Sequence, residues 1–83
     1  MKTTRYFEEQ VLRKRPYLSL QAIKGVIAAP LLRHVQEDGR VRLWGRVMAE
    51  PEGKSYVLRV ILLEDGETVH NAFFDRAFKA GAS

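Results

Sequence analysis

The residues of this chain best suited to chemistry are arginines interleaved with the only tryptophan and a histidine near the C-terminus. Histidine titrates near neutrality and can transfer a proton while a 2′-hydroxyl attacks the adjacent phosphate, and arginine can stabilise the charge that develops. His70 and Arg59 are therefore candidate catalytic residues. A guanidinium group also binds phosphate through a planar fork of donors, and tryptophan stacks on exposed bases. The candidate nucleic-acid contacts are Arg33, Arg40, Arg42, Trp44 and Arg46.

The same residues also have simpler explanations. An antiparallel sheet that carries helices on one side needs a polar outer face, and alternating arginines supply one. Trp44 can serve only to cover the sheet, and a histidine in a strand is more often structural than catalytic. Both interpretations stay open at this stage.

Two helices are expected before the strands begin. The first spans about residues 4–15 and ends at Pro16, and the second is capped by Ser19, continues to about residue 29 and ends at Pro30. Apolar residues recur at three- or four-residue spacing in both, which is typical of one buried face. Residues 1–30 are therefore predicted to form a helical hairpin.

After Pro30 the apolar period changes from 3.6 to 2, as expected for strands. Two Asp-Gly pairs, at residues 38–39 and 65–66, predict two-residue hairpin turns. The predicted strands cover about residues 31–37, 40–48, 55–63 and 67–74. The fold class is α+β, with two N-terminal helices packed on one face of a four-stranded antiparallel meander (ααββββ). The chain is one domain, residues 1–83, with the sheet over 31–76 and a tail over 77–83.

Two-residue turns would pair Arg33 with Trp44 and place both arginine and tryptophan on the face opposite the helices. The first hairpin would then give the core Leu32, His34, Val41, Leu43 and Val47. The second hairpin would pair Leu62 with Val69, Ile61 with His70 and Leu58 with Phe73. It would give the core Leu58, Val60, Leu62, Val69 and Phe73. The helix-free face would hold Arg33, Arg40, Arg42, Trp44, Arg46, Arg59 and His70, with an apolar patch of Val57, Ile61, Leu63 and Phe74. Such a patch calls for a cover: the tail from Phe78, a second copy or another protein.

Composition narrows the chemistry further. The net charge is +4, and residues 1–48 carry ten Lys and Arg against four acids, so the positive field belongs to the first part of the chain. The absence of cysteine excludes disulfides and thiolate sites. His34 and His70 are expected on opposite faces, so no metal site is predicted, and no cofactor motif occurs. The longest apolar run, residues 60–63, is far too short to span a membrane, and we expect a cytoplasmic protein without a membrane partner.

Four segments carry a resemblance to known proteins: residues 13–18 (RKRPYL), 38–45 (DGRVRLWG), 58–60 (LRV) and 63–79 (LEDGETVHNAFFDRAFK). They resemble a group of short, uncharacterised bacterial proteins that is distantly similar to BrnT and RelE-like toxins. The resemblance implies two helices with a four-stranded antiparallel sheet, and mRNA cleavage with or without the ribosome, held in check by an antitoxin. RelE-like members carry basic residues and sometimes a histidine or tyrosine on the open sheet face. The resemblance also adds Arg76 as a catalytic candidate, because BrnT-like chains carry an arginine-containing segment after the last strand.

Two main hypotheses follow. The first is a toxin-like RNA-binding protein or endoribonuclease that uses a basic sheet face and acts on RNA or the ribosome. The alternative is a non-catalytic protein-interaction or dimerisation module, which would bind an antitoxin or a second copy through the apolar patch. A winged-helix DNA-binding protein is a third option, but the second helix offers only Gln21 and Lys24 for base contacts.

Overall fold

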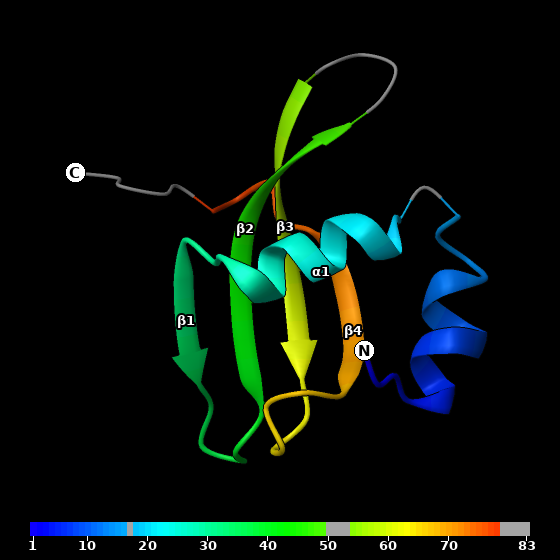
Figure 1. The fold of residues 1–83 in the computed structure, drawn as a ribbon, viewed down its shortest axis with the longest axis vertical. Coiled ribbons are helices and arrows are strands. Elements are labelled where there is room, and N and C mark those ends of the chain that lie inside the picture. The colour runs from blue at the N-terminus through cyan, green and yellow to red at the C-terminus, as the bar shows by residue number, and fades with distance from the viewer. Residues whose placement is uncertain (17, 50–53, 79–83) are drawn as a thin grey trace.

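The structure, a computed structural model, describes residues 1–16, 18–49 and 54–78. Its elements follow the order η1 (Phe7–Leu12), α1 (Leu20–Ala28), β1 (Leu32–Val35), β2 (Val41–Ala49), β3 (Lys54–Leu62) and β4 (Val69–Phe74). The four strands form one antiparallel sheet in the order β1-β2-β3-β4, with α1 across one face (Figure 1). The predicted α+β class with a four-stranded antiparallel meander is confirmed.

Helix α1 begins and ends where the sequence indicated. The hydroxyl oxygen of Ser19 accepts a hydrogen bond from the backbone N–H of Ala22 at 3.3 Å, which satisfies one of the free donors at the helix start. Ile23 and Val26 point toward the sheet and are buried against β2 and β3. The helix ends at Ala28, two residues before Pro30, which cannot continue it.

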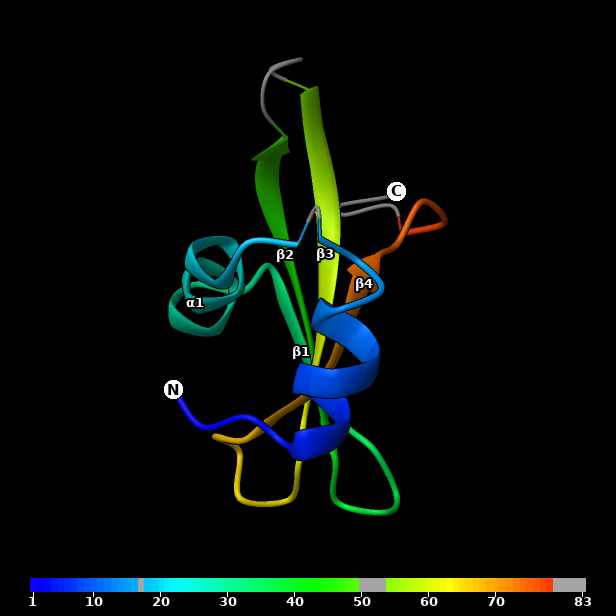
Figure 2. The same cartoon turned by 90° about the vertical axis from the view of Figure 1, so that its right-hand side faces the viewer.

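The first helical segment differs from the prediction. It is a six-residue π-helix, Phe7–Leu12, and it lies beside the edge strand β4, whereas α1 covers the sheet face (Figures 1 and 2). Residues 2–4 explain this position, because they pair with β4: Thr4 N–H donates to Val69 O at 3.0 Å, and Val69 N–H donates to Lys2 O at 2.8 Å. This pairing covers the β4 edge and places Phe7 and Val11 in the core, where they are 0% and 2% exposed.

The register of the first hairpin is shifted by one residue from the prediction. Gln36 N–H donates to Arg40 O at 2.8 Å, so the loop holds three residues, and its last residue, Gly39, has a φ of 91° that favours glycine. Leu32 therefore faces Trp44, and Arg33 faces Leu43. Because neighbouring side chains alternate between faces, Arg33 lies on the helix-bearing face, and the prediction that it lies on the helix-free face was wrong. The prediction that Leu32 and His34 belong to the core was wrong for the same reason, and both are exposed.

The second hairpin has a longer loop than predicted but keeps its first strand pair. Leu63 N–H donates to Thr68 O at 2.9 Å, so the loop holds four residues where two were predicted. Because the loop is longer by an even number of residues, the predicted pairing of Leu62 with Val69 is preserved. Asp65 organises the loop by accepting hydrogen bonds from the backbone N–H groups of residues 67 and 68 and from the Thr68 hydroxyl. These bonds lower the pKa of Asp65 to about 2.

A β-bulge at His70 then changes every later pair in β4. Ile61 faces Asn71, and Arg59 faces Phe73, so the predicted pairs Ile61–His70 and Leu58–Phe73 were wrong. Phe73 turns to the open side, and Ala72 takes its place in the core with no exposed surface.

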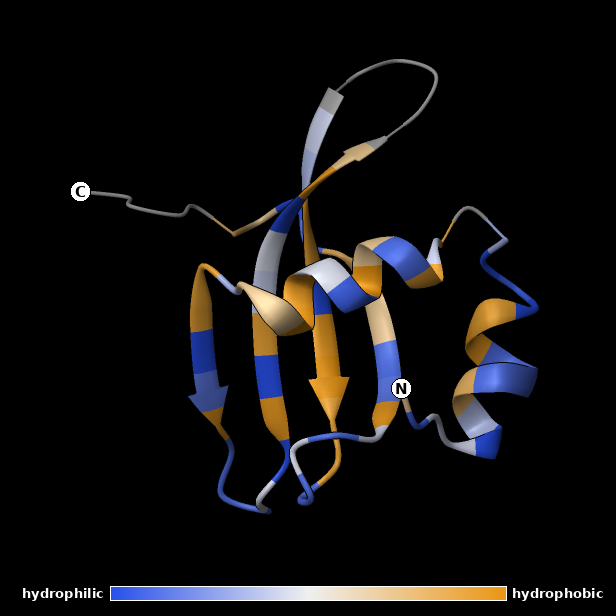
Figure 3. Ribbon diagram, in the orientation of Figure 1, coloured by the Kyte–Doolittle hydropathy of each residue, from blue (hydrophilic) through white to orange (hydrophobic). Residues whose placement is uncertain are grey.

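The core lies between α1, η1 and the sheet. It is built from Phe7, Val11, Leu18, Ile23, Val26, Val41, Leu43, Leu58, Val60, Leu62, Val69 and Ala72. Hydropathy alternates along β2, as expected for a strand with one buried face (Figure 3). Gly45 lets α1 approach β2 closely, since a Cβ there would lie 2.8 Å from a methyl carbon of Val26.

Candidate nucleic-acid interface on the open sheet face

The sheet surface opposite α1 collects most of the residues that the sequence singled out. We call it the open face, and the strand register assigns to it Leu32, His34, Arg42, Trp44, Arg46, Val57, Arg59, Ile61, Asn71 and Phe73. Arg42, Trp44, Arg46 and Arg59 are therefore placed as predicted. Arg40 directly precedes β2, and the bulge residue His70 lies near enough to feel its charge.

Arg59 occupies the centre of the open face and is held on several sides. Its guanidinium carbon lies 5.1 Å from the ring centroid of Trp44 and 5.0 Å from that of Phe73, which places the cation against two aromatic rings. Its Nη2 donates to a carboxylate oxygen of Asp75 at 2.6 Å. The Nε of Arg59 is buried and has no hydrogen-bond partner among the described residues. This guanidinium is committed to intramolecular contacts.

The Asp75 carboxylate binds both Arg59 and Trp44, and together with Phe73 these residues form the aromatic cluster. The oxygen that binds Arg59 also accepts a hydrogen bond from the indole N–H of Trp44 at 3.0 Å, and the other oxygen accepts from the backbone N–H groups of Ala77 and Phe78. These hydrogen bonds, led by that from Trp44 and joined by the charge of Arg59, lower the pKa of Asp75 although burial raises it. Asp75 is consequently an ionised carboxylate that joins strands β2 and β3 to residues 75–78, which we call the C-terminal segment.

The C-terminal segment lies over Trp44. The ring of Phe78 stacks on the Trp44 ring with centroids 5.6 Å apart and planes 19° from parallel, and only 7% of Trp44 remains exposed. The sequence offered the tail from Phe78 as one of three covers for the apolar patch; Phe78 itself lies on Trp44, and residues 79–83 of that tail lie outside the described residues. The apolar patch is also smaller than predicted, because Phe74 packs against the core on the helix side.

Two arginines from different parts of the chain meet at a pocket beside this segment. The pocket has a volume of about 290 Å³. It is lined by Arg46, Ser55, Tyr56, Val57, Phe74, Asp75, Arg76 and Phe78. Neither Arg46 nor Arg76 has an acidic partner within ion-pair distance in the part of the chain that the structure describes, whereas Asp75 is already neutralised by Arg59. A pocket lined by two arginines and a serine, beside a carboxylate that Arg59 already pairs, is suited to an anion.

His70 lies apart from that pocket. Its Nδ1 is 3.1 Å from the Thr4 hydroxyl oxygen, and its ring stacks on Tyr6 with centroids 4.9 Å apart. Burial, and then the charge of Arg40, lowers the pKa of His70, so the ring is neutral at pH 7. No contact among the described residues links His70 to Arg59 or Arg76. The three predicted catalytic residues thus lie in three different surroundings: the aromatic cluster, the pocket and the N-terminal segment.

A second polar pocket, of about 450 Å³, lies at the first hairpin. It is lined by His34, Gln36, Glu37, Asp38 and Arg42. With the Gln36 amide turned so that its oxygen faces Arg42, that oxygen accepts two hydrogen bonds from the guanidinium. Because two acids share this pocket with Arg42, it is a weaker anion site than the Arg46–Arg76 pocket.

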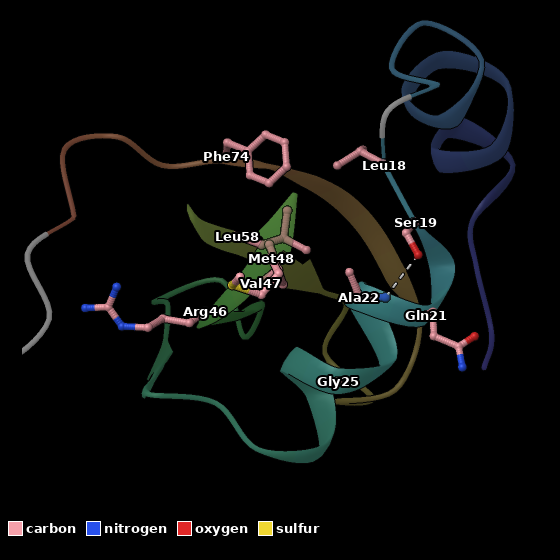
Figure 4. A pocket seen from close by; sticks show the side chains of 10 residues that line it. All are labelled: Leu18, Ser19, Gln21, Ala22, Gly25, Arg46, Val47, Met48, Leu58 and Phe74. Atoms are coloured by element: carbon pink, nitrogen blue, oxygen red, sulfur yellow. Dashed lines mark hydrogen bonds between the residues drawn. The ribbon is translucent and has the colours of Figure 1, made fainter. Parts of the chain in front are cut away.

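An apolar groove of about 560 Å³ lies on the helix side of the sheet, between α1, the C-terminal part of β2 and Leu58 of β3 (Figure 4). Leu18, Leu58 and Phe74 line its interior, whereas the side chains of Gln21 and Arg46 point away from the others. The Ser19 hydroxyl is already engaged at the helix cap. No set of polar groups converges in this groove, so it carries no evident chemistry.

The sequence did not indicate three features of the site. It did not assign a role to Asp75, although an aspartate directly after a strand is a common start of a turn that binds its own backbone two residues on. It also placed Phe73 in the core, because nothing in the sequence marks the bulge at His70. Arg46 and Arg76 line one pocket only because of the way the turn after β4 folds, and the hydrophobic periodicity of the sequence does not indicate the path of that turn.

No family model, no curated protein and no solved structure matches this chain. In the described ranges, no group of three or more His, Cys, Asp and Glu side chains is arranged to hold a metal ion. None of the helices in those ranges is long and apolar enough to cross a membrane.

Proposed function

We propose that this protein binds single-stranded RNA through the open face, with Arg46 and Arg76 as the principal phosphate contacts. The observation that carries the proposal is their shared pocket, which Ser55 also lines, together with the lack of an acidic partner within ion-pair distance of either arginine among the described residues. Arginine forks match phosphate oxygens in geometry, and a pocket of this volume admits a phosphate with part of its sugar. Arg42, on the same face and the same strand as Arg46, extends the positive surface.

A single strand fits this surface better than a duplex. The molecule measures 32 × 31 × 20 Å, and the candidate contacts lie on a sheet without a projecting helix. The helix α1 packs its apolar side on the opposite face, so it does not project from the open face into a groove of DNA. Flat sheets with basic and aromatic side chains are a recurrent way to bind unpaired nucleotides.

The resemblance to RelE-like toxins adds cleavage to the proposal, with His70 as the candidate base. A neutral imidazole can accept a proton at pH 7, and this supports the role. Only Nδ1 of the ring contacts the Thr4 hydroxyl, so when Nδ1 donates to that oxygen, Nε2 is the nitrogen that accepts the proton. Expression should then inhibit growth, and His70→Ala should relieve that inhibition. Wild-type protein that binds RNA but leaves it intact, with and without ribosomes, would restrict the function to binding.

The proposal is tested by the fluorescence anisotropy of a labelled oligouridylate titrated with the protein. We expect saturable binding that weakens as salt rises. Binding that is absent at low salt would contradict the proposal.

The β1 edge favours a second candidate, a protein-interaction module. Leu31, Leu32 and Val35 are each about half exposed there, at 50%, 48% and 49%. An edge strand with exposed apolar side chains is suited to pairing with another strand. Light scattering distinguishes the candidates, because pairing through β1 should be lost in Val35→Lys, on the helix-bearing side of the sheet, while RNA binding is retained.

A further inference from the structure

The contacts of Phe78 resemble those that a nucleotide would make on the same surface. Its ring stacks on Trp44 almost in parallel, at 19°, where an unpaired base would stack. Trp44 is held in place from two sides, because Asp75 binds its indole N–H and Arg59 lies against its ring. The open face therefore contains a preformed aromatic platform that the chain itself occupies.

The cover is anchored at one end and lightly held at the other. Asp75 is fixed to the sheet, since its N–H donates to Val57 O at 2.8 Å and its carboxylate binds Arg59 at 2.6 Å. Among the described residues, Phe78 is held by its ring contact with Trp44 and by its backbone N–H, which donates to the Asp75 carboxylate at 3.1 Å. Its ring can leave Trp44 while Asp75 stays in place.

The cover also borders the proposed phosphate pocket. Phe78, Asp75 and Arg76 all line that pocket together with Arg46. A strand whose phosphate sits between the two arginines therefore has its neighbouring nucleotide next to Phe78 and within reach of the ring beneath it.

We propose that Trp44 is a base-stacking subsite that Phe78 occupies in the free protein and that one unpaired RNA base occupies in the complex. Base and phenyl ring compete for the same aromatic surface, so Phe78 acts as an internal competitor that lowers the affinity for RNA. This inference rests on the proposed RNA binding, and it adds where one base goes and what it displaces.

The test uses Trp44, the only tryptophan, as an intrinsic probe. Wild-type protein is titrated with an oligouridylate and with an abasic oligomer of the same length, and Trp44 emission and its quenching by acrylamide are recorded. Phe78→Ala is titrated in the same way, with Tyr6→Ala as an aromatic truncation away from the platform, at His70.

We expect the oligouridylate, but not the abasic oligomer, to change Trp44 emission. Phe78→Ala should bind the oligouridylate roughly 2- to 10-fold more tightly, the range expected for removing one stacked aromatic competitor. It should not gain affinity for the abasic oligomer, and Tyr6→Ala should bind as wild type does.

Two results would overturn the inference in different ways. If the oligouridylate binds but Trp44 emission is unchanged and Phe78→Ala binds equally or more weakly, Phe78 is a structural lid and RNA binding stands without it. If neither oligomer binds any variant, the proposed function fails, and the stacking subsite fails with it.

Discussion

Replacement of Asp75 by Asn should destabilise this protein more than the neutralisation of an exposed acidic residue does. Asn keeps the shape of the side chain and can still accept hydrogen bonds, but it leaves the Arg59 cation without its counter-ion. Breaking a buried ion pair costs about 3–5 kcal/mol. The Asp75 side chain is only 9% exposed, but that of Arg59 is 25% exposed, so water compensates part of the loss. We expect the free energy of unfolding to fall by about 2–3 kcal/mol.

Asp38→Asn is the matched control. Asp38 also faces an arginine, Arg40, but at 3.9 Å and with both side chains about half exposed. An exposed pair of this kind is worth roughly 0–1 kcal/mol, so the variant should remain close to wild type. Urea unfolding followed by far-ultraviolet circular dichroism measures both without relying on Trp44 itself. Equal effects of the two substitutions, or a loss below about 0.5 kcal/mol for Asp75→Asn, would refute the assigned role of Asp75.

Two further predictions concern the core and the titration of His70. Gly45→Ala should lower the unfolding free energy by about 1–3 kcal/mol in the same urea assay, because its methyl group would lie 2.8 Å from Val26; Gly25→Ala, with open space around it, should not destabilise. Burial and the charge of Arg40 lower the pKa of His70 in the folded protein, so protonation of His70 favours the unfolded chain. The neutral ring therefore contributes its full share of folding stability above about pH 6.5. This contribution is lost as the pH falls through the folded pKa. Stability should therefore fall as the pH is lowered below about 6.5 in wild type and less steeply in His70→Gln, and parallel pH profiles would show that His70 does not titrate differently on folding.

The sequence predicted the number and order of the strands well, because hydrophobic alternation and two Asp-Gly pairs mark them directly. It predicted faces less well, since the face of every residue in a hairpin depends on whether the loop length is even or odd. The first loop holds three residues where two were expected, so Arg33 and His34 exchanged faces. The second loop holds four residues where two were expected, so Leu62 and Val69 kept their pairing.

For the candidate site, the sequence likewise predicted positions within the strands but not the contacts made by turns. Arg42, Trp44, Arg46 and Arg59 could be placed because they alternate within two long strands whose register is continuous. The commitment of Arg59 to Asp75 could not be predicted, because it requires the C-terminal turn to fold back across β2 and β3. Likewise, the position of η1 follows from the pairing of residues 2–4 with β4, and such a short pairing leaves no periodic signal.

The most direct test of RNA binding at the open face is the salt dependence of binding by Arg46→Ala/Arg76→Ala. Lys24→Ala/Arg33→Ala is its matched control, since it removes the same charge from outside the open face. If Arg46 and Arg76 each neutralise one phosphate, the slope of log K against log salt should become less negative by about 1.4, near 0.7 for each phosphate of a single strand. We predict this change for the pocket variant and almost none for the control. Equal slopes for the two variants would show that RNA is attracted by net charge alone, and would contradict an interface on the open face.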